Sequence, residues 1–220
     1  MQRLRGGGVR GFCGAVTTAT LCVLVACGQA YSEQPVSGGA SSDADAKDAD
    51  LSLCDGCKLV FVTSEVFAGT SLGTPEVAAT LCRDAAARSR IPTVAARSVK
   101  FMAWLSVGNT GATGVGAVLP DARYVRPDGA KVCPNKADLL DGDLDDPILM
   151  DENGLYLTSP AKVWTGTQPS GRTSGATCAS WSDAGEIGDY GVAGERGGGW
   201  TLTGSSPCAT KLRLYCFEGF

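Results

Sequence analysis

The cysteines constrain most strongly what this chain can fold into. The sequence holds ten Cys and no His in 220 residues. So many thiols are unusual in a reducing cytosol, and the lack of His excludes a mixed Cys/His zinc site. We therefore expect a folded domain in an oxidising compartment, braced by structural disulfides, with no metal site and no cofactor.

Residues 1–26 have the pattern of an export signal. Three Arg within the first ten residues precede an apolar stretch, Phe12 to Ala26, that is short for a stable membrane span. Its end, Leu24-Val25-Ala26-Cys27, resembles the bacterial lipobox, which makes Cys27 the predicted lipid attachment residue. Gly28 after the Cys resembles the sorting choice for the bacterial outer membrane, facing the periplasm or the cell surface. The alternative is an ordinary cleaved signal with an incidental Cys.

Residues 27–57 are predicted to form a flexible tether. Ser32 to Leu53 is rich in Ser, Gly, Ala and Asp and has little apolar surface to bury. Cleavage before Cys27 removes three Arg and no acid, so the net charge changes from −4 to −7. Nucleic acid is therefore not an expected partner. The predicted partners are the membrane, through the lipid anchor, and a glycan or protein ligand.

We expect residues 58–220 to form one globular domain. Because the chain has thirty Gly, we expect about as many residues in loops as in helices and strands. Thr74-Pro75-Glu76 is a good helix start, and an apolar face follows it. The period-two apolar run near the end of the sequence predicts a strand inside a sheet. The expected elements are a strand at Lys58–Thr63, a helix with Val77, Ala78, Leu81, Cys82 and Ala85 on its apolar face, a buried strand at Phe101–Ser106, a hairpin at Tyr124–Val132, and the terminal strand through Leu212, Leu214 and Cys216.

Cys54-Asp55-Gly56-Cys57 is the pattern of a redox pair, whose reactive thiol usually stands at a helix N-terminus. Here the motif leads into a strand, so we favour a structural role. With Cys27 acylated, seven Cys remain in the exported part. An odd number leaves one thiol free or paired between molecules.

The most acidic part of the domain is Asp138–Glu152. Asp146 occupies the position where an EF-hand calcium loop needs Gly, and no helices flank the segment, so solvated turns are favoured over a calcium site. A hydrolase without His would need paired carboxylates, such as Asp141 with Asp143 or Asp151 with Glu152. The acids that match positions 1, 3, 5 and 12 of the EF-hand are Asp141, Asp143, Asp145 and Glu152.

The spacing of Trp, Cys and Gly in the last third resembles the closing half of the collagen endostatin domain. The matching residues are Trp164-Thr165-Gly166, Pro169, Gly171-Arg172, Cys178-x-x-Trp181, and Cys208 with Cys216. A second set resembles an uncharacterised domain that recurs in bacterial lipoproteins and surface proteins. That set is Val62-Thr63-Ser64, Ala103-Trp104-Leu105-Ser106, Tyr124-Val125-Arg126, Ala137-Asp138-Leu139, Val163-Trp164-Thr165-Gly166-Thr167 and Leu214-Tyr215-Cys216-Phe217-Glu218.

Both families have the C-type-lectin-like fold. The resemblance implies an α+β domain of twisted antiparallel strands, with few helices, long loops and nested disulfides, Cys82 to Cys216 and Cys178 to Cys208. The remaining thiols are then Cys54, Cys57 and Cys133, and the sequence leaves open which one is unpaired. Endostatin's zinc-binding His residues have no counterpart in this chain.

These observations favour a lipid-anchored extracytoplasmic binding module without catalytic residues, because loops on a braced scaffold suit recognition. Specificity is expected in the loops Gly108–Arg123 and Gly171–Gly199, which include Tyr190 and Glu195. Trp164 and Trp181 are expected in the core. The alternatives are a carboxylate-dependent secreted-side hydrolase and a structural envelope lipoprotein.

Overall fold

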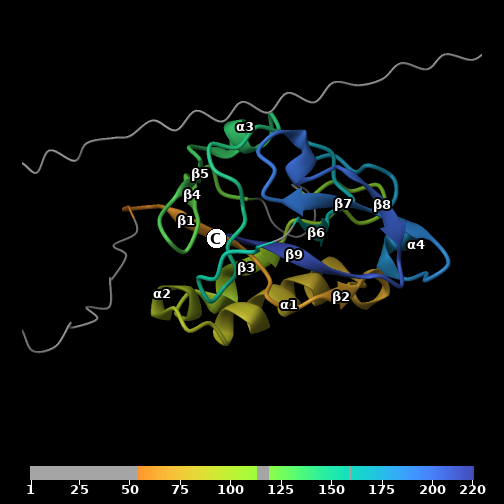
Figure 1. Cartoon of the computed structure of the whole chain (residues 1–220), viewed down its shortest axis with the longest axis horizontal. Helices are drawn as coiled ribbons and strands as arrows, with labels where there is room; N and C mark the ends of the chain where they lie inside the picture. Colours follow the sequence, from red (N-terminus) through yellow and green to blue (C-terminus); the bar gives the residue numbers. More distant parts are fainter. Residues whose placement is uncertain (1–53, 113–118, 159) are drawn as a thin grey trace, which may run out of the picture. The chain divides into compact units, whose positions relative to one another are not determined.

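A computed structural model describes residues 54–112, 119–158 and 160–220 (Figure 1). The predicted signal, Cys27 and the tether up to residue 53 lie outside the described residues. A nine-stranded sheet forms the centre of the described part, and its main path runs β5-β4-β1-β9-β6-β7-β8, with β2 and β3 also paired to β9. The strands are β1 (Lys58–Val62), β2 (Phe67–Ala68), β3 (Phe101–Ala103), β4 (Tyr124–Val125), β5 (Lys131–Cys133), β6 (Ala161–Trp164), β7 (Ile187–Ala193), β8 (Gly204–Pro207) and β9 (Lys211–Glu218).

The terminal strand β9 is central, as its apolar run predicts. It pairs antiparallel with β1, β2 and β3 and parallel with β6. The segment of β9 that includes Leu214, Tyr215, Cys216 and Phe217 is buried on both faces, which is why it reads as a continuous apolar run at its end. The sheet can therefore be completed only when β9 pairs with the strands that precede it in the sequence.

The expectation that all strands pair antiparallel is wrong for two pairs of neighbouring strands. β1 pairs with β4 in parallel, and so does β6 with β9. Parallel pairing needs a long crossover, and both connections supply one: the first runs through α1 (Pro75–Ala87) and the second through β7 and β8. The architecture is α+β, with a mixed sheet, few helices and disulfides.

α1 begins where the sequence predicts. Thr74 Oγ1 accepts a hydrogen bond from Val77 N at 3.4 Å, and Pro75 occupies the first helical position. Ala78, Cys82 and Ala85 form the buried stripe as expected, but Val77 is 43% exposed. Val77 lies one position, about 100°, round the helix from Ala78, so it falls outside the stripe.

Shorter elements complete the fold. The predicted strand Phe101–Ser106 is regular only in β3, although Trp104 N and Ser106 N still donate to Tyr215 O and Thr165 O. The predicted hairpin is present, with Gly129 at φ +84° in its turn. The remaining helical elements are α2 (Pro92–Ala95), α3 (Lys136–Leu139), α4 (Cys178–Trp181), η1 (Gly69–Ser71), η2 (Ser98–Lys100) and η3 (Gly198–Trp200).

The sheet separates two hydrophobic clusters because successive strand residues point to opposite faces. On β1, Leu59 and Phe61 join the cluster under α1 and α2, whereas Val60 and Val62 join the cluster on the other face. In Figure 1, α1 and α2 lie below the sheet and α3 above it. We call the first the helical face and the second the loop face.

Disulfides brace the helical face. Cys82 of α1 is bonded to Cys216 of β9, and Cys178 to Cys208, which is the nested pattern that the resemblance implies. A third disulfide joins Cys54 to Cys57. Of the cysteines that the structure describes, Cys133 alone is unpaired, and it is buried in the loop-face cluster.

The tryptophans are core residues, as expected for Trp164 and Trp181. Trp164, Trp181, Trp200 and Trp104 are fully buried. Trp164 Nε1 donates to Phe67 O at 3.0 Å, and Trp181 Nε1 donates to Ser106 O at 2.7 Å. Their rings are therefore not available as platforms for a ligand.

Candidate functional site

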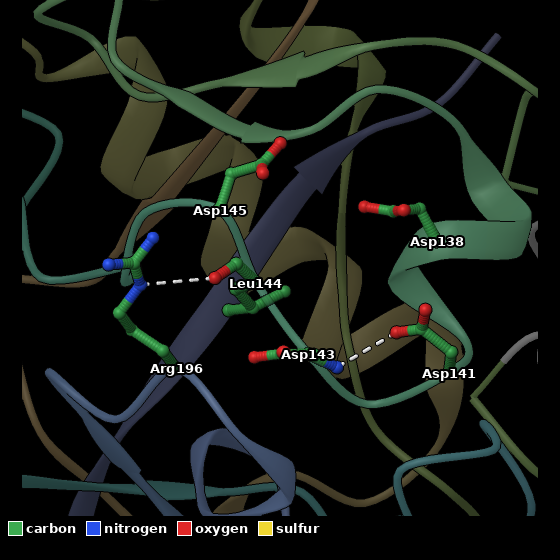
Figure 2. A pocket seen from close by; sticks show the side chains of 6 residues that line it. All are labelled: Asp138, Asp141, Asp143, Leu144, Asp145 and Arg196. Atoms are coloured by element: carbon green, nitrogen blue, oxygen red, sulfur yellow. Dashed lines mark hydrogen bonds between the residues drawn. The ribbon is translucent and has the colours of Figure 1, made fainter.

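An acidic hollow of about 430 Å³ lies on the loop face beside α3. Figure 2 shows Asp138 and Asp141 on one side, Arg196 on the other and Leu144 between them. We call this surface the acidic hollow. Its lining residues are Asp138, Asp141, Asp143, Leu144, Asp145 and Arg196.

The acidic wall is a sequence of capped turns. Asn135 Oδ1 accepts from Asp138 N at 2.9 Å and caps α3. Asp141 Oδ1 then accepts from Asp143 N at 2.9 Å across Gly142, whose φ is +90°. A Cβ on Gly142 would lie 2.6 Å from the Pro169 side chain, so both the space and the backbone angle require Gly. These contacts fix the backbone that carries the carboxylates.

The opposite wall is the turn that follows β7. Leu144 N donates to Arg196 O at 2.7 Å, and Arg196 Nε donates back to Leu144 O at 3.1 Å (Figure 2). The Arg196 guanidinium thus links the two walls by a hydrogen bond to a main-chain oxygen. Among the described residues it forms no ion pair with a carboxylate of the acidic hollow.

The charge in the acidic hollow is only partly compensated. Asp145 lies 2.9 Å from Lys131 Nζ, and both side chains are more than 40% exposed, so this ion pair adds at most about 1 kcal/mol to stability. Within the described part of the chain, Asp138, Asp141 and Asp143 form no ion pair. Partial desolvation, followed by repulsion from Asp141 and Asp145, raises the pKa of the Asp138 carboxyl. The surface therefore attracts positively charged groups.

The calcium-loop template is not assembled. Glu152, its twelfth position, is buried and accepts hydrogen bonds from both the backbone N and the Oγ of Ser64. The described residues contain no group of three or more His, Cys, Asp or Glu side chains placed to hold a metal ion. Most of the segment forms turns, but the expectation of solvated turns without a flanking helix is wrong in part: α3 (Lys136–Leu139) includes its first residues, and Asp151 and Glu152 are buried.

The two carboxylate pairs considered for a hydrolase differ in environment. Asp151 and Glu152 are each only 4% exposed, and Asp151 Oδ1 accepts from Asn153 N and Leu155 N at 2.9 Å. This pair stabilises a turn. Asp141 and Asp143 face solvent in the acidic hollow instead.

A second hollow, of about 300 Å³, shares the turn after β7. Glu195 lines it, whereas the next residue, Arg196, lines the acidic hollow. One exposed turn therefore contributes to two neighbouring hollows. The other residues of the second hollow are mainly apolar: Leu149, Leu157, Thr158, Pro160, Val192, Ala193 and Gly194.

The predicted specificity loops need correction. Gly171–Gly199 is not one loop, because β7 spans Ile187–Ala193 and contains Tyr190. The Tyr190 ring is half-buried, with Lys162 Nζ 4.3 Å from its centre. Glu195 does lie in a loop, as predicted. Part of Gly108–Arg123, residues 113–118, lies outside the described residues.

α4 is a left-handed turn, which the sequence does not reveal. Cys178, Ala179, Ser180 and Trp181 have φ between 49° and 61°. This conformation costs about 1–2 kcal/mol per residue for side chains other than Gly. The disulfide at Cys178 and the buried indole of Trp181 hold the turn, while Ala179 and Ser180 are exposed.

Comparison with protein-family models and with curated proteins gives no match to this chain. In the described part, no helix is long and apolar enough to cross a membrane. The predicted lipid attachment residue, Cys27, lies outside that part.

Proposed function

We propose that this chain is a lipid-anchored extracytoplasmic binding module without catalytic activity, attached through Cys27 to the bacterial outer membrane. We further propose that its fold is C-type-lectin-like and related to the endostatin domain. The two nested disulfides and the central terminal strand support that assignment.

One observation carries the binding proposal: the acidic hollow holds carboxylates that the fold does not pair with charge. Asp138 lies in α3, which Asn135 caps, and Asp141 and Asp143 lie on the following turn, whose backbone is fixed by their hydrogen bond and by Gly142. Fixed loops lose little conformational entropy when a ligand binds, so this surface suits recognition. A protein ligand with Lys or Arg side chains, or a glycan with amino groups, has the complementary charge.

The lipid anchor has separate support. Leu24-Val25-Ala26-Cys27 resembles a lipobox, and the disulfides suit an exported domain because they persist in oxidising compartments. Two or more acyl chains make a lasting anchor, whereas one chain binds a membrane only reversibly.

The test is a screen of the purified full chain against an amino-sugar-containing glycan array and against detergent-solubilised envelope proteins. A variant with Asp138→Asn, Asp141→Asn and Asp143→Asn keeps the size and the cap geometry while it removes three charges. The matched control, Asp84→Asn, Asp183→Asn and Glu186→Gln, removes three charges from exposed positions elsewhere.

We expect a ligand that binds the wild type and the control alike and binds the acidic-hollow variant at least tenfold more weakly. A ligand that binds all three equally would contradict the acidic hollow as the site. Turnover of a peptide, ester or glycoside that is lost in the acidic-hollow variant would favour the hydrolase instead.

A further inference from the structure

The segment from the middle of α1 to η2 is basic, in contrast to the acidic domain as a whole, although Glu76 is exposed in the first turn of α1. Residues 81–100 hold five basic residues and one acid, Asp84, although acids outnumber bases in the full chain. We call this surface the basic helical face. Its basic residues are Arg83, Arg88, Arg90, Arg97 and Lys100, of which Arg97 is half-buried and the others are exposed.

The basic helical face adjoins the point where residues 27–57 enter the domain. Arg97 donates to Cys57 O at 3.2 Å and to the buried carboxylate of Glu218 at 3.0 Å. Lys58 Nζ donates to Gly219 O at 3.0 Å, and Gly219 N donates to Lys100 O at 2.9 Å. The end of the tether, the end of the sequence and η2 therefore lie together.

Exposed apolar side chains lie among these charges. Val99 and Phe220 are 76% and 77% exposed, and the bond from Gly219 to Lys100 brings Phe220 alongside η2, which carries Val99. Leu155 is 63% exposed in a turn that is tied to the end of α1, where Arg90 N donates to Asn153 Oδ1 at 3.1 Å. Basic residues interspersed with apolar ones are typical of surfaces that rest on anionic lipid headgroups.

Acids reduce this positive charge only in part. Glu65 pairs with Arg88 at 3.2 Å, and Glu218 is enclosed by Arg97 and Lys58. Asp55 and Asp84 are exposed near the same residues. Arg83, Arg90 and Lys100 form no ion pair with a described residue.

We propose that the basic helical face docks onto an anionic phospholipid bilayer, the same membrane that holds Cys27. This proposal rests on the proposed lipid anchor for its geometry. The sequence predicts that Ser32 to Leu53, which lies outside the described residues, has a reach on the order of 25 to 30 Å by random-coil scaling. The tether enters the domain beside the basic helical face, so it holds that face at high effective concentration near the headgroups. α3 lies on the other side of the sheet (Figure 1), and the acidic hollow beside it is left free for a ligand.

The size of the effect follows from charge. Each Lys or Arg near an anionic bilayer strengthens binding about fivefold, so removing two weakens docking about 25-fold. The attraction extends about one Debye length, roughly 8 Å at physiological salt and 3 Å at 1 M, so high salt releases the domain. A lipid anchor does not depend on salt in this way.

The experiment measures hydrogen exchange in the full chain, purified from its host membrane and mixed with vesicles. One set is pure phosphatidylcholine, and the other contains 30% phosphatidylglycerol. Docking predicts severalfold slower exchange at 88–100 and at 219–220 on the anionic vesicles only, with no change at 138–145. The double variant Arg90→Gln/Lys100→Gln loses this protection, whereas the control Arg172→Gln/Lys211→Gln, which removes two exposed bases elsewhere, retains it.

Equal exchange on the two vesicle types, or equal loss in the control, overturns docking. The same protection from dissolved polyphosphate without vesicles overturns the bilayer as the partner. The anchor is judged separately, by the mass of the amino-terminal peptide in the same sample. A peptide without acyl chains refutes the anchor, and salt-sensitive protection by added anionic vesicles still supports docking.

Discussion

The two faces of the sheet are stabilised in different ways. The helical-face cluster contains Cys57 and all four cysteines of the two long-range disulfides, and its outer surface is basic. The loop-face cluster contains no disulfide among the described residues. It is filled by Trp104, Trp200, Tyr215 and Phe217, whose neighbouring rings lie 5.1 to 6.4 Å apart.

The free thiol fits this contrast. Cys133 belongs to the loop-face cluster, and burial raises the pKa of its thiol to about 12, so it is protonated and unreactive at neutral pH. The covalent bracing and the candidate binding surface are therefore on opposite faces of the sheet. The acidic hollow depends on packing and turn geometry, whereas the tether joins the covalently braced face.

The largest expected effect is the loss of the long disulfide. Cys82→Ala/Cys216→Ala opens a loop with a sequence separation of 134, which costs about 5 kcal/mol of unfolding free energy in the chain-entropy model. Cys178→Ala/Cys208→Ala, with a separation of 30, should cost about 3.5 kcal/mol. Urea unfolding measures both. Equal stability of the first variant and the wild type would show that the helical face does not depend on its covalent brace.

The aromatic face should be nearly as sensitive. Trp200→Ala removes a fully buried ring that packs on Trp104, Tyr215 and Phe217, and we expect a loss of about 3–5 kcal/mol. Trp200→Phe should cost clearly less, because the indole N–H has no hydrogen-bond partner in this structure. A loss from Trp200→Ala below 1 kcal/mol would mean that aromatic packing does not hold the loop face.

A smaller, pH-dependent effect is expected at the hairpin turn. Burial alone would raise the pKa of Asp128, but hydrogen bonds from Arg126 and Tyr156 outweigh it and lower the pKa to about 2. The unfolded value is about 3.9, so this carboxylate stabilises the fold above about pH 4, and the effect disappears as the pH falls through 2.

Asp128→Asn should therefore cost about 1–2 kcal/mol between pH 5 and 7 and almost nothing near pH 2. Chemical unfolding of both proteins across this range gives the difference directly. A difference that does not change with pH would assign the stabilisation to packing rather than to charge.

The smallest effect on stability is expected in the acidic hollow. Asp138→Asn with Asp141→Asn and Asp143→Asn should change the unfolding free energy by less than about 0.5 kcal/mol, because these side chains make no ion pair and repel one another. Any gain in stability would come from relieved repulsion. A loss above 2 kcal/mol would make the carboxylates structural and remove the reason to consider them a binding surface.

Much of the scaffold could be predicted because its signals are local. A few neighbouring residues are enough to predict the Thr74-Pro75 start of α1, the hairpin turn before Lys131 and the apolar run of β9. The parallel pairings could not be predicted, because they depend on how long connections cross the sheet. The left-handed turn at α4 could not be predicted either, because its residues do not favour that conformation. Only the Cys178 disulfide and the burial of the Trp181 side chain hold it.

The candidate site was predicted only in part. The run of acids from Asp138 to Glu152 drew attention to the right segment, but the sequence did not separate the buried pair, Asp151 and Glu152, from the exposed acids before it. Arg196 closes the acidic hollow from a distant turn through Leu144, and no local pattern links the two. The basic helical face was not predicted, because its five basic residues are spread over 81–100 and its link to the tether depends on the contacts of Arg97 and Lys58.

The most direct test concerns Cys27, because the proposed function depends on a lipid anchor and the docking of the basic helical face takes its geometry from it. Mass spectrometry of the amino-terminal peptide, on protein purified from bacterial membranes, should find Cys27 as the first residue with acyl chains attached. Cys27→Ala should then leave the protein unprocessed or in the soluble fraction. An unacylated amino terminus at another residue, or normal membrane fractionation of Cys27→Ala, would contradict the lipid-anchored module.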